Sequence, residues 1–136
     1  MDAVQTALNW DLSNPMTFLI QRKGMSPDYV QEMAQEYRRY IGIIAANPHL
    51  KFPVSEAVDE MWHTHILFTK DYRHMGDEVC GQYIGHYPVM SQEERISLLP
   101  DYVEQTPGQY EALYGEKPPG KWWPNDGAIC FSCSGW

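Results

Sequence analysis

Three histidines and one cysteine gather in a short stretch of the chain: His63, His65, Cys80 and His86 lie within 24 residues. The imidazole nitrogen of histidine and the thiolate sulfur of cysteine are the usual protein ligands of zinc. Asp59 precedes the stretch and could complete such a site or orient a ligand, because ligating histidines commonly donate their second nitrogen to a carboxylate. We therefore expect these four side chains to form a metal centre for zinc or another divalent transition metal.

The expected helical geometry of this stretch leaves two different centres open. Side chains two positions apart on a helix point about 200° apart, so His63 and His65 cannot both bind one ion unless the helix is distorted. His65 belongs to the apolar stripe of the helix, so a closed, structural site would use it. His63 lies on the other side with Asp59, one turn earlier, so a more open, catalytic site would use that pair. Cys80 and His86 complete either centre.

The same residues also have an explanation without metal. A histidine on an apolar stripe is commonly a hydrogen-bonded core residue, and a single buried cysteine behaves as a small hydrophobic side chain. Asp59 and His63 would also suit an ordinary pair of neighbours on a helix surface. We expect His49 and His74, which lie outside the pattern, to be in solvent.

Helix signals dominate the sequence and place the expected site on a helix. Sustained alternation of apolar and polar residues is missing, which leaves few strands or none. The predicted helices, from capping residues and apolar spacing, cover Ser13 to Gly24, Pro27 to Ala46, Glu56 to Met75, Ser91 to Pro100 and Thr106 to Gly115. The sequence thus predicts an all-α protein, a compact bundle of about four to five helices. Residues 1–124 would form one helical domain, followed by a short Cys-containing tail over 125–136.

The C-terminal end is too rich in proline and glycine for a helix. We expect an irregular tail that Trp122 and Trp123 anchor to the domain. Cys130 and Cys133 form a lone Cys-x-x-Cys pair, but thioredoxin-like catalysis needs such a pair at a helix start in an α/β fold. A metal clip or two free thiols is therefore the expectation for this pair.

The residues around the expected site resemble the pattern of the glycine-rich domain-containing protein family. That pattern appears here as Asp59, Trp62-His63-Thr64-His65 with Leu67, Tyr72, Cys80 and Gly85-His86. The resemblance extends to Tyr110 and the Trp122-Trp123 pair, but this chain has Phe68-Thr69 where many members have proline and keeps only a brief tail. It implies a mostly helical domain and adds weight to the His and Cys positions as a site, without a settled reaction.

Composition excludes several classes of function. The 136 residues carry ten Lys and Arg against eighteen Asp and Glu, a formal charge of −8. Such an acidic protein repels phosphate backbones and anionic lipid, so we expect neither nucleic acid nor a membrane as its partner. The beginning of the chain lacks the features of a secretory signal, and three cysteines are too few for a disulfide scaffold, so we expect a cytoplasmic protein.

Two functions fit these features. The first is a small helical module with a structural His/Cys metal centre that acts through contacts with a protein partner. The second is a metal-dependent hydrolase or oxidoreductase, with Asp59 or Glu60 as a base and Tyr72 or Tyr83 assisting a substrate. Four protein ligands would favour the module, whereas three ligands with an open position would favour the enzyme.

Overall fold

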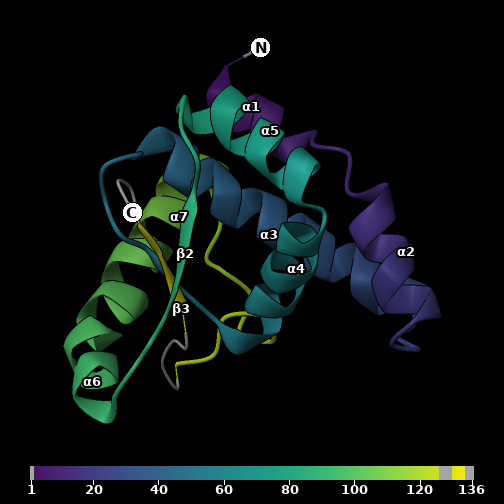
Figure 1. Cartoon of the computed structure of the whole chain (residues 1–136). Coiled ribbons are helices and arrows are strands. Elements are labelled where there is room, and N and C mark those ends of the chain that lie inside the picture. Colours follow the sequence, from purple (N-terminus) through teal and green to yellow (C-terminus); the bar gives the residue numbers. More distant parts are fainter. Residues whose placement is uncertain (1, 126–129, 134–136) are drawn as a thin grey trace.

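The computed structural model describes residues 2–125 and the backbone of residues 130–133 (Figure 1). Its helices are α1 (Ala3–Leu8), α2 (Ser13–Gln21), α3 (Pro27–Ala46), α4 (Glu56–Leu67), α5 (Thr69–Cys80), α6 (Gln92–Pro100) and α7 (Thr106–Tyr114). A π-helical segment, Asp101–Gln105, joins α6 to α7. Three short strands complete the described part: β1 (Pro53–Val54), β2 (Gly85–Pro88) and β3 (Cys130–Cys133). The fold is all-α, as the sequence predicts, with one very small sheet.

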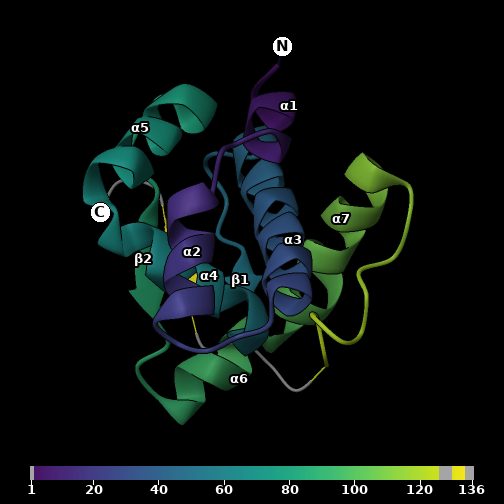
Figure 2. The ribbon, with the colours of Figure 1, turned by 90° about the vertical axis from the view of Figure 1, so that its right-hand side faces the viewer.

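The longest helix, α3, is the centre of the bundle. It begins after Ser26, whose side chain accepts a hydrogen bond from the Tyr29 amide, and Pro27 occupies its first turn. Its apolar residues recur at steps of three and four, so most of one face is buried. Helices α1, α2, α4, α5 and α7 all contact it, and Figure 2 shows α3 between α2 and α4 on one side and α7 on the other. The predicted range of this helix is confirmed.

The single continuous helix predicted from Glu56 to Met75 is wrong. The helix is interrupted at Phe68, and two helices, α4 and α5, cover this range. The backbone there (φ −90°, ψ 69°) is not helical, and it separates α4 from α5. The residue carries no proline or glycine signal, and the apolar stripe runs on through it, so periodicity could not show the break. The turn allows Asp71, on α5, to accept a hydrogen bond from His65 of α4. A tertiary contact thus stabilises the change of direction.

The three strands form one antiparallel sheet in the order β1-β3-β2. β3 lies in the segment predicted to be an irregular tail, and strands of two to four residues are too short to show alternation in a sequence. His86 on β2 pairs with Ser132 on β3. β1 leads directly into Ser55, whose hydroxyl caps α4 by accepting from the Val58 amide. The sheet therefore links the start of α4 to the strand that carries His86.

The two tryptophans anchor the C-terminal part of the chain, as expected. Trp122 and Trp123 are both buried. The Trp123 indole Nε1 donates to Glu36 at 3.0 Å, and the Tyr110 hydroxyl donates to the same carboxylate oxygen at 2.8 Å. Glu36 is itself buried on α3, so these bonds satisfy a carboxylate that would otherwise be costly to bury.

Among the helices that the structure describes, none is both long and apolar enough to cross a membrane.

Candidate metal centre

One face of α4 carries the first two residues of the site. Asp59 and His63 lie one turn apart, so their side chains are neighbours on the helix surface. The His63 Nε2 atom lies 3.2 Å from Asp59 Oδ2. The Ser55 cap fixes where the helix begins, and thereby which side of α4 these residues occupy. This is the arrangement that the sequence assigns to the more open of its two alternative centres.

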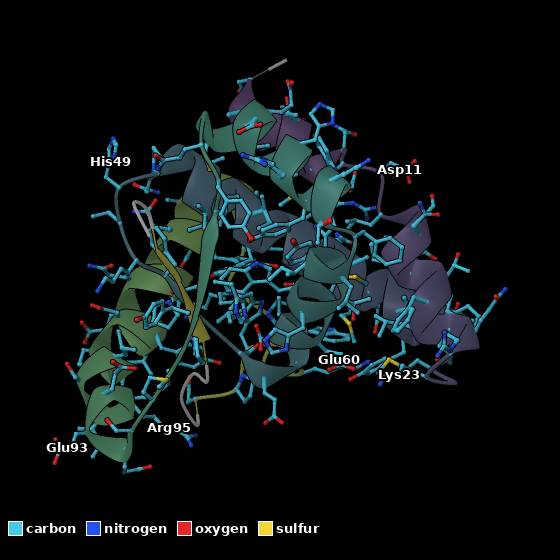
Figure 3. All side chains as sticks on the ribbon, in the orientation of Figure 1. Asp11, Lys23, His49, Glu60, Glu93 and Arg95 are labelled. Carbon is cyan, nitrogen blue, oxygen red and sulfur yellow. The ribbon has the colours of Figure 1, made fainter. Side chains whose placement is uncertain are left out.

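β2 brings the third residue to the same place. The His86 imidazole Nε2 donates to Asp59 Oδ1 at 2.8 Å, across 27 residues of sequence. The centroid of the His86 ring lies 4.5 Å from that of His63 and 4.2 Å from that of Trp62. One candidate ligand atom from each of Asp59, His63 and His86 lies within 4.8 Å of the others. Figure 3 shows side chains filling the space between α4 and β2.

The three side chains of the cluster differ strongly in their exposure to solvent. The Asp59 side chain is 1% exposed and that of His86 is 13% exposed, whereas that of His63 is 53% exposed. A buried carboxylate needs cationic or hydrogen-bonding partners, and two imidazoles on its two oxygens supply them. The exposed His63 ring leaves one side of the group in contact with solvent. An ion bound between these three residues would thus be reached from the His63 side.

His65, expected as a ligand, lies apart from this cluster. Its Nδ1 accepts from the Tyr37 hydroxyl at 2.7 Å, and its Nε2 donates to Asp71 Oδ2, also at 2.7 Å. The same Asp71 oxygen accepts from the Trp10 indole at 3.1 Å. Both ring nitrogens are thus engaged in a network that joins α3, α4 and α5. Burial lowers the pKa of His65 and outweighs the opposing effect of Asp71, which favours a neutral ring. These hydrogen bonds agree with the interpretation of His65 as a core residue that needs no metal.

Cys80, also expected as a ligand, ends α5 and is half-buried. Among the described residues, the ligand atoms that gather are those of Asp59, His63 and His86, without the Cys80 sulfur. Burial raises the pKa of the Cys80 thiol to about 11, so in the absence of a metal the thiol is protonated at neutral pH. The carboxylate of Asp59, which the spacing indicated as a completing residue, lies where the sequence placed Cys80 in the cluster, and Cys80 as a ligand stays a prediction.

Hydrogen bonds connect the buried residues that lie beside the cluster. The Trp62 indole donates to the Tyr72 hydroxyl at 2.8 Å, and that hydroxyl donates to the Ile84 carbonyl at 2.6 Å. These bonds join α4, α5 and the segment that leads into β2. Burial raises the pKa of Tyr72, so the phenol stays neutral, and its donor and its acceptor are both used structurally. We assign Tyr72 to the positioning of β2, in place of the substrate role considered for it from the sequence.

The two remaining histidines lie on the surface, as expected. His49 is exposed in the loop after α3 and is labelled in Figure 3. His74 is exposed on α5 and lies 3.4 Å from Glu78, one turn later.

A family model described as UCP032817-like matches residues 5–97. The chain belongs to the UCP032817-like family. The matched range is more than half of the chain and contains all three residues of the cluster. No curated protein and no solved structure matches the chain. The resemblance to the glycine-rich domain-containing proteins stays a prediction.

The UCP032817-like range ends within α6. It contains the Ser55 cap, Trp62 and Tyr72, so the residues that position Asp59 and His86 lie in the family part of the chain. The strand β3 and the Trp122-Trp123 anchor lie after it. Within the matched range, β2 is held to α4 by side-chain hydrogen bonds, and β3 adds backbone pairing from outside that range.

Proposed function

We propose that Asp59, His63 and His86 bind one divalent transition metal ion, with zinc the first candidate. The observation that carries this proposal is the Asp59 carboxylate placed between two imidazole Nε2 atoms, at 2.8 Å and 3.2 Å. Ligands of a tetrahedral zinc ion lie about 2.0–2.2 Å from the metal, and hence about 3.4 Å from one another. Small side-chain movements would be enough to convert the hydrogen-bonded cluster into a coordination shell.

The donor set narrows the choice of metal. Two imidazoles and a carboxylate suit zinc, and the same set with open positions also suits non-haem Fe(II). Magnesium and calcium prefer all-oxygen sites, so they fit poorly. We therefore expect a borderline transition metal, and zinc and iron are to be compared in solution.

An open site favours chemistry over a purely structural role. Structural zinc sites are closed by four protein ligands, whereas catalytic sites keep three and leave a position for water or substrate. The three described donors and the exposed His63 support the second type, a metal-dependent hydrolase or oxidoreductase. A metal ion in such a site supplies an activated water or polarises a substrate oxygen. With Asp59 engaged as a ligand, Glu60 on the same turn of α4, labelled in Figure 3, becomes the candidate base.

The structural module with a protein partner, and its cytoplasmic location, stay predictions from the sequence. The cluster also has an explanation without metal. The 2.8 Å separation of His86 and Asp59 is ordinary for a hydrogen bond, so the three residues could serve only to fasten β2 to α4. The two explanations differ in what happens when metal is added.

Calorimetric titration of zinc and of Fe(II) into the chain, purified without a histidine tag and stripped with chelator, tests the proposal. We expect one ion per chain, with binding lost in Asp59→Asn, His63→Gln and His86→Gln. Matched controls are His49→Gln and His74→Gln, which remove exposed histidines outside the cluster. Cys80→Ser should keep full affinity. If the control variants and the cluster variants bind metal alike, the three residues of the cluster serve only to hold β2 against α4 by hydrogen bonds.

A further inference from the structure

A groove opens at the junction of α4 and α5, lined by Ile66, Thr69, Lys70, Arg73 and Tyr83. Its volume is about 390 Å³, within the range of small-molecule sites. The first four residues come from the end of α4 and the first turns of α5, and Tyr83 comes from the segment before β2. The groove therefore shares α4 with the candidate metal centre, and Tyr83 lies in the segment that leads into β2.

One groove residue, Ile66, lies beside His63 on α4, and another, Tyr83, lies in the segment that leads to His86. Ile66 follows His63 by three positions on α4, so the two side chains are neighbours on the helix surface. Tyr83 precedes His86 by three residues, and its ring packs against Tyr72 with centroids 5.4 Å apart. The groove therefore lies next to the exposed His63 on the surface of α4.

The charge of the groove is opposite to that of the protein. Lys70 and Arg73 lie three positions apart on α5, both exposed. Within the described residues neither has a carboxylate within 4.0 Å, whereas Arg39 and Lys121 are ion-paired. Asp71, between them in sequence, is directed to His65 and Trp10. Two neighbouring like charges on a helix repel each other, and a bound anion would offset that repulsion.

The rest of the lining is apolar or aromatic. Ile66 is half-buried, and Tyr83 is 47% exposed. An arginine next to an exposed aromatic ring suits a flat group that carries a carboxylate or a phosphate. Thr69 adds one hydroxyl that can donate to such an oxygen.

We propose that this groove binds a small organic anion, a carboxylate or phosphate ester with a flat apolar group, as the substrate of the metal centre. Lys70 and Arg73 hold the anionic group, and Tyr83 and Ile66 contact the apolar part. That the anion is a substrate depends on the proposed metal centre, but anion binding in the groove can be measured without metal.

The test measures binding of benzoate and phenyl phosphate to the full chain by ¹H–¹⁵N NMR titration, before and after zinc is added. Benzamide, which has the shape of benzoate without its charge, is the neutral control. The variant is Lys70→Ala/Arg73→Ala, and its match is Lys23→Ala/Lys117→Ala, which removes the same charge elsewhere. Both pairs are exposed, so folding is not at risk, and thermal melting checks this.

We expect anion affinity to fall at least tenfold in Lys70→Ala/Arg73→Ala, to persist in the matched variant, and to exceed that of benzamide. Zinc affinity should be the same in both variants, and zinc should strengthen anion binding. Equal anion affinity in the two variants, or equal affinity for benzamide, would overturn the groove as an anion site. If the anion result holds but wild-type chain binds no metal, the anion site is supported and the metal centre fails. Anion binding that zinc does not strengthen would overturn its assignment as the substrate site.

Discussion

The His86 imidazole and the Asp59 carboxylate are hydrogen-bonded at 2.8 Å, and this contact joins β2 to the buried face of α4. Asp59 lies in the first turn of α4, close to the positive end of the helix dipole, which also stabilises a carboxylate. The exposed His63 reaches the other oxygen of the same carboxylate. One acidic residue therefore organises both histidines, and its removal should affect stability and metal binding together.

Replacing Asp59 by alanine should destabilise the metal-free chain by about 1–3 kcal/mol, because the buried His86 nitrogen loses its acceptor. Urea unfolding of the chelator-treated protein measures this. Glu56→Ala, an exposed acidic residue of the same helix, is the control and should change stability by less than about 0.5 kcal/mol. Equal effects of the two variants would contradict the role of Asp59.

Zinc should stabilise the wild-type chain against unfolding and leave His63→Gln unchanged. A ligand that binds only the folded state adds RT ln(1 + [L]/Kd), about 2.7 kcal/mol at a hundredfold excess over Kd. Because His63 is half exposed, its substitution should alter metal binding with little effect on the metal-free fold. Thermal melting with and without zinc measures the difference. A zinc-induced shift of the same size in His63→Gln would count against His63 as a ligand.

The His65 network should make stability fall in mild acid. Burial lowers the pKa of His65 in the folded chain, so between that pKa and about 6.5 the unfolded chain binds a proton that the folded chain does not. Falling pH therefore favours unfolding, with a slope of at most about 1.4 kcal/mol per pH unit from this group. Above a pH of about 7 the ring is neutral in both states, so this group adds no pH dependence.

Urea unfolding between pH 7 and pH 5 checks this dependence. His65→Gln should flatten it, although the variant is less stable at every pH because hydrogen bonds to Tyr37 and Asp71 are weakened. His49→Gln, in which an exposed histidine is lost, should keep the wild-type slope. An unchanged slope in His65→Gln would show that other groups cause the acid sensitivity.

Trp62 is fully buried, in keeping with its helical phase. Trp62→Ala should cost about 3–5 kcal/mol, because a large core side chain is removed. Trp62→Phe keeps most of the volume but loses the hydrogen bond to Tyr72, so we expect a loss of about 1 kcal/mol. Guanidinium unfolding of both variants measures the two effects, and a Trp62→Ala chain as stable as wild type would contradict the placement.

Gly76 lets the segment before β2 pack directly on α5. A Cβ atom at this position would lie 2.8 Å from the Gln82 carbonyl oxygen and 3.2 Å from the Ile84 amide nitrogen. Gly76→Ala should therefore cost about 1–3 kcal/mol, since backbone must shift, and it should weaken metal binding by displacing His86. Gly108→Ala in α7, where a Cβ meets nothing within 4 Å, is the control. Undiminished stability and metal affinity in Gly76→Ala would refute the close packing.

Local spacing accounts for the parts of the fold and site that the sequence predicts. Capping residues and the three- and four-residue spacing of apolar side chains are sufficient to predict the range of α3. Helical phase alone predicts that His63 and His65 lie on opposite sides of the helix. The break at Phe68 is accompanied by the contact between Asp71 and His65, six residues apart across a turn, which periodicity does not encode. Cys80 follows that break, so spacing alone could not place it relative to the cluster. The strand β3 forms through pairing with two distant segments, and its own four residues carry little signal.

Anomalous scattering at the zinc edge, from crystals of the tag-free chain grown with zinc, tests metal binding by the cluster most directly. We expect one fully occupied peak bonded to a carboxylate oxygen of Asp59 and to the Nε2 atoms of His63 and His86, with the remaining position facing solvent. A peak at Cys80 or at His65, or no peak in this cluster at saturating zinc, would contradict the proposed centre.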